Sequence, residues 1–257
     1  MDIEIRELIS RTDHSDTFWG VYRDDGLSKE VVVKKAHDSQ SGQSFSNEHE
    51  ALKELKHPNI VELIGADEKS KTLYLSAERG VCLRCLFENL SAPDLVCALS
   101  YLHQLSNVLG YIHDDSSHPA FVHYDISDGN FIIVDGKLVL LDFGTSYRLD
   151  RIPDSHRNAL IGSLDSMSPE KFKRQPELGR ESDVFAFGTI AYRLVTGFRP
   201  FSPEMGSVRE QILHYGPLPP TTQIPELNQL IMACLSKDPK DRPRANELLD
   251  FFSRTSD

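Results

Sequence analysis

The stretch that decides the fold spans residues 123–130, which read His-Tyr-Asp-Ile-Ser-Asp-Gly-Asn, and is completed by Asp-Phe-Gly at residues 142–144. Asp125 stands five residues before Asn130, and Asp142 follows twelve residues after that asparagine. Transfer of a phosphoryl group from Mg-ATP needs such a set: one carboxylate accepts the proton of the attacking hydroxyl, while an amide and a second carboxylate hold magnesium against the phosphates. These three side chains are therefore the first candidates for a catalytic centre.

This stretch resembles the catalytic loop and the magnesium loop of eukaryotic-type protein kinases. Lys34 ends a β-branched run, where that family keeps the lysine that contacts the phosphates, and Glu48 lies where the family keeps the partner glutamate. Further matches occur in the family's order at Ser168-Pro169-Glu170, Ser182 to Gly188, Asp238-Pro239 and Arg242-Pro243. The resemblance covers essentially the whole chain, and the segment Tyr111 to Pro119 is similar to the tyrosine-kinase-like group, which includes receptor-like kinases.

The resemblance implies an α+β fold with two lobes, the bilobal protein-kinase fold. A single protein kinase domain would span residues 1–257, with a small β-rich N-lobe carrying one helix over about 1–77, a hinge over about 78–81, and a larger, mainly helical C-lobe over about 82–257. Hydrophobic periodicity agrees with this order. It predicts strands at residues 31–34, 60–64, 72–75, 131–134 and 138–141, and helices at 45–56, 98–113, 184–195 and from about 244.

The same resemblance assigns chemical roles. Asp125 would be the catalytic base, and Lys34 and Glu48 would form the ion pair that contacts the phosphates. Asn130 would serve both catalysis and metal binding, with Asp142 as the second metal ligand. The implied cofactors are ATP and Mg²⁺, with Mn²⁺ as a substitute, and the implied partner is a protein substrate or a protein that binds the domain.

An adenine pocket is expected between the lobes. The residues expected around it are Val21, Val32, Ala77, Glu78, Gly80 and Ile132. Ala77 falls at the gatekeeper position by this alignment, so a deep pocket is expected behind the adenine. Val32 replaces the family's usual alanine and crowds the roof of the pocket.

Several residues are expected to support the site rather than to act in it. By resemblance, His123 would pack under Phe143, and Asp183 would cap backbone N–H groups of the catalytic loop. Arg242 would pair with Glu170.

The family's glycine-rich loop is degenerate in this chain. Counting back from Val21 puts His14, Asp16 and Trp19 where the family has three glycines, and Gly20 is one position late. Glycine serves there because backbone N–H groups must approach the phosphates without an intervening Cβ. We therefore expect weakened phosphate contacts, with the Asp16 carboxylate brought toward the polyphosphate.

Two residues of the catalytic loop also depart from the family. Tyr124 replaces an arginine that receives an activation-loop phosphate, so activity is expected to be independent of that modification. Ser127 replaces a lysine that reaches the γ-phosphate, and loss of a cation from the transition state predicts a slow enzyme. Ser163, after Gly162, stands where kinases of serine and threonine keep a threonine that touches the catalytic aspartate, which favours those hydroxyls as substrates.

Three functional hypotheses follow. The first is a serine/threonine-protein kinase, because all five catalytic and metal-binding side chains are present. The second is a pseudokinase that acts as a nucleotide-binding or protein-interaction module, because the glycine-rich loop and Ser127 depart from the pattern. The third is a small-molecule phosphotransferase, against which Ser168-Pro169-Glu170 and the helical lobe after it argue.

Composition sets outer limits on function. The 257 residues carry a formal net charge of −11, which disfavours binding to nucleic acid or to an anionic membrane surface. Apolar stretches are strand-sized, so no membrane span is expected, and a cytoplasmic location is the prediction. Four cysteines make no disulfide framework, and Cys82-x-x-Cys85 is interpreted as two cysteines at a helix start in preference to a metal or redox site.

Overall fold

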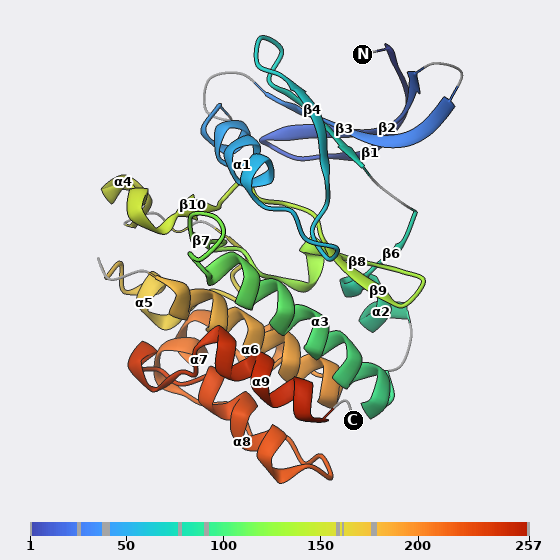
Figure 1. Ribbon diagram of the computed structural model, residues 1–257. Helices are drawn as coiled ribbons and strands as arrows, with labels where there is room; N and C mark the ends of the chain where they lie inside the picture. The colour runs from blue at the N-terminus through green and yellow to red at the C-terminus, as the bar shows by residue number, and fades with distance from the viewer. Residues whose placement is uncertain are drawn as a thin grey trace.

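The computed structural model describes residues 2–24, 27–37, 42–76, 79–89, 93–157, 160, 162–175 and 179–255. A sheet with one helix lies above a larger helical part, so the two expected lobes are present (Figure 1). The strands are β1 (Asp2–Arg11), β2 (Ser15–Asp24), β3 (Leu27–Ala36), β4 (Leu63–Asp67), β5 (Thr72–Ser76), β6 (Val81–Cys82), β7 (Phe121–Val122), β8 (Phe131–Val134), β9 (Lys137–Leu140) and β10 (Tyr147–Arg148). The helices are α1 (Gly42–Glu54), α2 (Leu83–Asn89), α3 (Leu95–His113), α4 (Asp154–Arg157), α5 (Pro169–Phe172), α6 (Arg180–Thr196), α7 (Val208–His214), α8 (Pro225–Cys234) and α9 (Ala245–Thr255).

The N-lobe sheet has the order β1-β2-β3-β5-β4 and is antiparallel throughout. Alternation along β3 gives its two faces different tasks. Val31 and Val33 are fully buried on one face, while Val32 and Lys34 lie on the other face, the one to which α1 presents Glu48. The β-branched run therefore forms the expected strand and delivers a lysine to the underside of the sheet.

The strand expected at residues 60–64 is largely wrong. β4 begins only at Leu63, and Ile60 makes a single bridge to Leu140 of β9. The Val61 N–H donates to the Leu140 carbonyl at 3.0 Å, and the Asn59 side-chain amide donates to the Leu138 carbonyl at 2.6 Å. Because these groups bond to the C-lobe hairpin, the segment joins the two lobes instead of extending the sheet.

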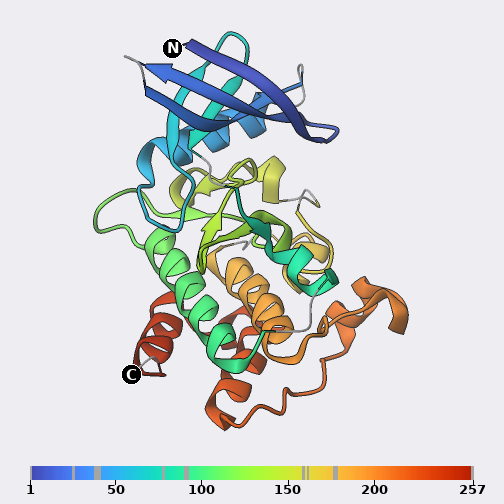
Figure 2. The same cartoon turned by 90° about the vertical axis from the view of Figure 1, so that its right-hand side faces the viewer.

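The C-lobe is built around α3 and α6, with α9 packed against α3 (Figure 1). The hairpin of β8 and β9 turns at Asp135 and Gly136, whose φ values of 49° and 79° are those of a type I′ turn. α6 ends at Gly197, which adopts the left-handed conformation. Figure 2 shows the hairpin lying between the N-lobe sheet and the helices, the position from which it can form the floor of a cleft.

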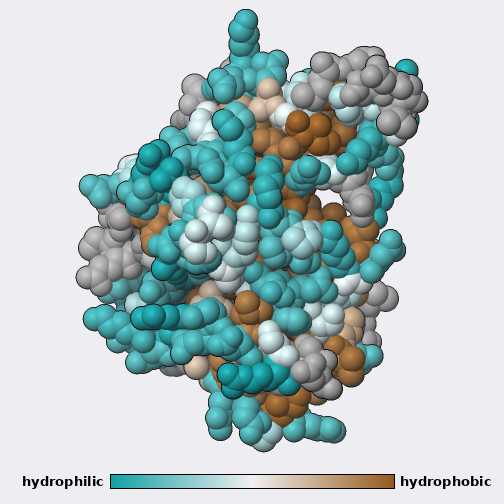
Figure 3. All heavy atoms as spheres, in the orientation of Figure 1, coloured by the Kyte–Doolittle hydropathy of each residue, from teal (hydrophilic) through white to brown (hydrophobic). Residues whose placement is uncertain are grey.

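Polar side chains cover most of the face in Figure 3, and apolar ones form separate patches on both lobes. Among the described helices, none is both long and apolar enough to cross a membrane.

Candidate active site

Lys34, Glu48 and Asp142 meet beneath the N-lobe sheet. The Lys34 Nζ lies 2.7 Å from Glu48 Oε2 and 2.9 Å from Asp142 Oδ1. Burial raises the pKa of Glu48 to about 7, against the opposing pull of Lys34. Burial lowers the pKa of Lys34, but the Asp142 and Glu48 carboxylates outweigh it and raise that pKa overall. Lys34 therefore keeps its charge, and the expected ion pair is formed.

Asp125 and Asn130 are joined by direct hydrogen bonds. The Asn130 Nδ2 donates to the Asp125 carbonyl at 2.7 Å and to Asp125 Oδ2 at 2.9 Å. The other carboxylate oxygen, Oδ1, accepts from the Ser163 backbone N–H at 2.8 Å. Ser163 thus touches the aspartate as expected, although it does so through its backbone amide. This network holds the Asp125 carboxylate in one orientation.

Asn130 and Asp142 together suit a hard divalent cation. Because the Asn130 Nδ2 is engaged by Asp125, the amide oxygen is the atom left to face a cation. Asp142 Oδ1 accepts from Gly144 N and contacts Lys34, which leaves Oδ2 on a side chain that is 46% exposed. The Leu141 N–H bonds to the Asn130 carbonyl at 2.9 Å, which holds Asn130, just before β8, beside the segment just after β9 that carries Asp142. Amide and carboxylate oxygens are the ligands that Mg²⁺ prefers.

The supporting residues take their expected places. The His123 and Phe143 rings lie edge to face with centroids 4.8 Å apart. Asp183 is fully buried and accepts from the backbone N–H groups of His123 and Tyr124, each at 2.8 Å. Backbone amides of the catalytic loop are thereby satisfied inside the C-lobe, which fixes the loop before any substrate binds.

Lys171 is a residue that sequence reasoning missed. It follows Glu170 in α5, is only 2% exposed, and donates from Nζ to the Tyr124 carbonyl at 3.2 Å. Its Nζ also lies 4.9 Å from the Tyr124 ring centroid, a cation–π distance. Burial lowers the pKa of Lys171 to about 8, with Asp125 first among the carboxylates that oppose the shift. A cation therefore lies beside Tyr124, the tyrosine that replaces the family's arginine. The position of Lys171 in the sequence gives no sign of its burial, because it follows Glu170 as a solvent-exposed lysine could.

The turn between β1 and β2 is closed by the side chain of Thr12, one of its own residues. Thr12 Oγ1 accepts from the His14 N–H at 3.2 Å and from the Ser15 N–H at 3.0 Å. Gly20 lies within β2, where an added Cβ would stand 3.0 Å from the Glu4 carbonyl. Gly20 therefore allows the close approach of β1 and is not part of the turn. The turn offers backbone N–H groups, but it contains none of the glycines that the family uses there.

The expectation that Asp16 points toward the phosphates is wrong. Directly opposed residues of an antiparallel pair share a face. Asp16 pairs with Lys35, one residue away from the pairing of Thr17 with Lys34, so it lies on the opposite face from Lys34. There Asp16 Oδ1 bonds to Arg11 at 2.8 Å, and this bond is the main reason why the pKa of Asp16 is lowered. The register of the hairpin thus removes the predicted repulsion.

Trp19 occupies the cleft face instead. It pairs with Val32 across β2 and β3, so both side chains look the same way as Lys34. The Arg79 guanidinium carbon lies 4.7 Å from the indole centroid, and Arg79 also pairs with Glu30 at 3.3 Å. An indole thus stands on this face where the family has a glycine.

The hinge is only partly described. Ala77 and Glu78 lie outside the described residues, so the adenine contacts assigned to them stay predictions. Gly80 packs so closely on β8 that a Cβ would lie 2.6 Å from the Ile133 carbonyl. Leu75 is 4% exposed and pairs with Val32, so it shares the cleft face with that residue at the end of β5. The register therefore puts a large side chain at the back of the cleft, one residue before Ser76 ends the strand.

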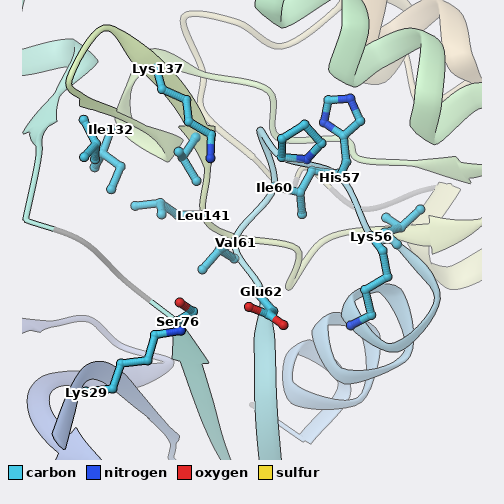
Figure 4. Close-up of a pocket in the computed structure, with 14 residues that line it drawn as sticks. Lys29, Lys56, His57, Ile60, Val61, Glu62, Ser76, Ile132, Lys137 and Leu141 are labelled. Carbon is cyan, nitrogen blue, oxygen red and sulfur yellow. The ribbon is translucent and has the colours of Figure 1, made fainter.

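A cavity of about 390 Å³ adjoins this region, and its lining comes from both lobes (Figure 4). Ile132 and Leu141 contribute from the C-lobe, and Val61 and Ser76 from the N-lobe. Of the expected adenine neighbours, the lining includes Ile132.

Comparison with known proteins decides the family. A family model described as the protein kinase domain matches residues 22–251. The chain belongs to the protein kinase family. The matched region runs from β2 to α9 and includes Lys34, Glu48, Asp125, Asn130 and Asp142.

Similar kinases come from distant organisms. The chain is 30% identical over 262 residues to mitogen-activated protein kinase kinase kinase 7 of Homo sapiens, covering 98% of this chain and 41% of that protein. It is 29% identical over 227 residues to Aurora kinase of Saccharomyces cerevisiae, covering 86% and 59%, and 26% identical over 260 residues to tyrosine-protein kinase MasK of Myxococcus xanthus, covering 88% and 38%. The chain spans about two fifths of the length of the first of these relatives.

Proposed function

We propose that this kinase domain transfers the γ-phosphoryl group of ATP to serine and threonine hydroxyls of proteins. The observation that carries the proposal is the joint placement of two sets of groups. Lys34 is held between Glu48 and Asp142, while Asp125 and Asn130 are hydrogen-bonded to each other and Asn130 is bonded to Leu141, the residue before Asp142. Positioning and electrostatic stabilisation supply most of the catalysis in this reaction, and these residues provide both.

Each residue has a distinct task in the proposed reaction. Lys34 presents an ammonium group to the phosphates, and Glu48 keeps it pointed into the cleft. Asp125 accepts the proton of the attacking hydroxyl, with Asn130 and the Ser163 N–H fixing its carboxylate. When bound through Asn130 and Asp142, Mg²⁺ would neutralise charge on the phosphate oxygens.

The same geometry supports a low rate. Ser127 is 3% exposed and uncharged, so it cannot replace the cation that the family directs at the γ-phosphate. Loss of one such donor typically costs about 10²–10³ in turnover. Lys171 does not replace it, since its ammonium group is bonded to the Tyr124 carbonyl within the C-lobe.

A second candidate, a pseudokinase that acts as a binding module, is favoured by the β1–β2 turn. There the His14 and Ser15 N–H groups are already taken by Thr12, and Trp19 fills the cleft face of β2. These features weaken nucleotide binding but remove no catalytic side chain, so we rank this candidate second.

Transfer of radiolabel from γ-labelled ATP to the protein itself and to a generic protein substrate distinguishes an active kinase from a pseudokinase. We expect slow transfer by the parent, none by Asp125→Asn or Asp142→Asn, and parental transfer by Asp250→Asn, which changes an exposed carboxylate in α9. Phosphoamino-acid analysis should find phosphoserine or phosphothreonine. Absence of transfer by the parent, with a thermal shift on adding Mg-ATP, would establish the binding module instead.

A further inference from the structure

Two cysteines where the hinge enters the C-lobe have no part in the site described above. Cys82 ends β6 and Cys85 lies in the first turn of α2. Cys82 immediately precedes Leu83, the first residue of α2, so the two cysteines lie three residues apart across the first turn of that helix. A disulfide requires Cβ atoms roughly 3.5–4.5 Å apart, so a small adjustment of the helix start would bring the two sulfur atoms within bonding distance.

The thiol pair is attached to the catalytic loop. Cys82 Sγ lies 3.7 Å from the Asp128 carbonyl and 3.9 Å from the Gly129 carbonyl, to both of which it donates. Arg84, between the two cysteines in sequence, donates from Nε to Asp128 Oδ1 at 2.8 Å. These carbonyls directly precede the metal-binding Asn130, so a change at the sulfur atoms acts on the loop through short contacts.

Gly129 makes this arrangement possible. An added Cβ there would stand 2.9 Å from a terminal nitrogen of Arg84. The guanidinium group therefore occupies the space that a side chain would fill. Asp128 is held from its other side by Arg193, which leaves Arg84 as the member of the network next to the thiols.

The chemistry of both thiols suits oxidation as a pair. Each cysteine is partly exposed, so a small oxidant can reach it. The pKa of Cys85 is raised, first by the Cys82 sulfur and then by burial. Because the thiolate is the form that attacks peroxide, the raised pKa makes Cys85 a slow first nucleophile and suits it to the second step, attack on an oxidised Cys82.

We propose that Cys82 and Cys85 form an intramolecular disulfide when the protein meets a hydroperoxide. One cysteine sulfur breaks the O–O bond of hydrogen peroxide and becomes a sulfenic acid with release of water. The second thiol then attacks that sulfur, the S–O bond breaks, and a second water leaves as the S–S bond forms. Two electrons pass from the two thiols to one peroxide.

Formation of this bond changes the contacts of the loop. The Cys82 S–H is consumed, so the Asp128 and Gly129 carbonyls lose a donor. Shortening the sulfur–sulfur separation to about 2.05 Å draws Cys82 and Cys85 together and moves Arg84 relative to Asp128. The disulfide therefore loosens the catalytic loop from α2.

Thiol mapping of the whole chain tests the proposal. The protein is treated with hydrogen peroxide, alkylated with iodoacetamide, digested and analysed by mass spectrometry. We expect the peptide with Cys82 and Cys85 to lose two hydrogen atoms and escape alkylation until dithiothreitol is added. Cys97 is a matched control, because it is a similarly exposed cysteine in α3, and it should remain alkylated throughout.

Single variants sharpen the result. Cys82→Ser and Cys85→Ser should each carry a sulfenic or sulfinic acid on the remaining cysteine after peroxide and no intramolecular bond, whereas Cys97→Ser should behave as the parent does. Separate sulfinic acids at Cys82 and Cys85 in the parent, or a bond to Cys97 or between chains, would overturn the proposal. In hydrogen exchange, amides of residues 125–131 should exchange faster in the oxidised parent and return to the original rate after dithiothreitol. Unchanged exchange would refute the coupling to the loop. These readouts do not depend on kinase activity.

Discussion

At the scale of single residues, Lys171 shows how a lost charge can be supplied from elsewhere in the chain. Its ammonium group is buried and hydrogen-bonded to a neutral carbonyl, the backbone oxygen of Tyr124. A buried cation without a close anionic partner costs stability, which is why the pKa of Lys171 falls to about 8. It remains charged for most of the population at neutral pH, and the residue to which it is bonded directly precedes Asp125, the proposed catalytic base.

Replacing Lys171 with methionine should therefore stabilise the fold near pH 7 and lower the transfer rate. The folded-state pKa of about 8 lies below the ordinary 10.5, so the unfolded chain binds more protons between these values and parental stability rises with pH across that window. The advantage of Lys171→Met, at most about 3 kcal/mol, should shrink from pH 8 to 10.5. Urea unfolding at several pH values measures it, with Lys173→Met, an exposed neighbour, as the control. An advantage that does not change with pH would contradict this account.

Leu75 offers a second test at this scale. Because it shares the cleft face with Val32, its side chain should exclude purines that carry a bulky substituent. Leu75→Gly should admit such an analogue with at least about a tenfold gain in affinity, by analogy with the cost of filling a closed pocket. Calorimetric titration measures the change, with Tyr74→Ala, on the opposite face of the same strand, as the control. Tight binding of the analogue by the parent would favour the sequence alignment that places Ala77 at the gatekeeper position.

At the scale of elements, the β1–β2 hairpin departs most from its family. Side-chain alternation turns Trp19 toward the cleft and Asp16 away from it, so the obstacle to nucleotide is steric rather than electrostatic. The turn itself is rigidified by Thr12, whose hydroxyl oxygen accepts from two N–H groups.

Trp19→Gly should consequently raise the affinity for Mg-ATP several-fold, because it removes the indole and restores a glycine at the family's position. Phe18→Gly is the matched control, since it makes the same change one residue away on the opposite face. Isothermal titration of the three proteins provides the comparison. Equal affinities would show that the indole does not restrict the nucleotide.

The activation segment is anchored without a phosphate. β10 pairs with β7 through Tyr147 and Val122, and Thr145 Oγ1 donates to the His123 carbonyl at 2.8 Å. Tyr124 is buried with Val122 and Ile152 in a small apolar cluster. We expect treatment with a protein phosphatase to leave the transfer rate unchanged, in a radiolabel assay before and after treatment. Loss of activity would mean that a phosphate is bound elsewhere.

At the scale of the whole molecule, a buried ion pair joins the end of the activation segment to the last helices. The Arg242 guanidinium donates to both Glu170 oxygens, at 2.8 and 2.7 Å, and both side chains are almost fully buried. The same guanidinium reaches the carbonyls of Glu181 and Ser236, so α5, α6 and the segment before α9 share one cation.

Arg242→Met should lower the free energy of unfolding by about 3–5 kcal/mol, because it leaves the buried Glu170 carboxylate without its cationic partner and with the neutral Ser182 hydroxyl still donating to it. The double variant Glu170→Gln with Arg242→Met should recover part of that loss. Chemical unfolding of both, beside Arg244→Met, checks the pair. A double variant no more stable than Arg242→Met alone would assign the loss to the carbonyl contacts instead.

How far prediction from sequence reached depended on how local the information was. Asp125, Asn130 and Asp142 could be assigned because a loop and a hairpin of defined length carry them, and spacing along the chain largely determines spacing in space. Lys34 and Glu48 could be paired because each matches a position of the kinase family's pattern, while periodicity by itself indicated only the strand and the helix that carry them.

Sequence by itself therefore determined the lobes, most of the order of elements and the side chains that we propose as the catalytic set, since these depend on periodicity and on spacing within motifs. Only the tertiary structure decided that Asp16 faces away from the cleft, that Leu75 bounds its back, and that Lys171 is buried beside Tyr124. The physical reason is that a shift of one residue in strand register reverses the face of every side chain. Burial of a lysine likewise depends on contacts between segments far apart in sequence, which local pattern does not record.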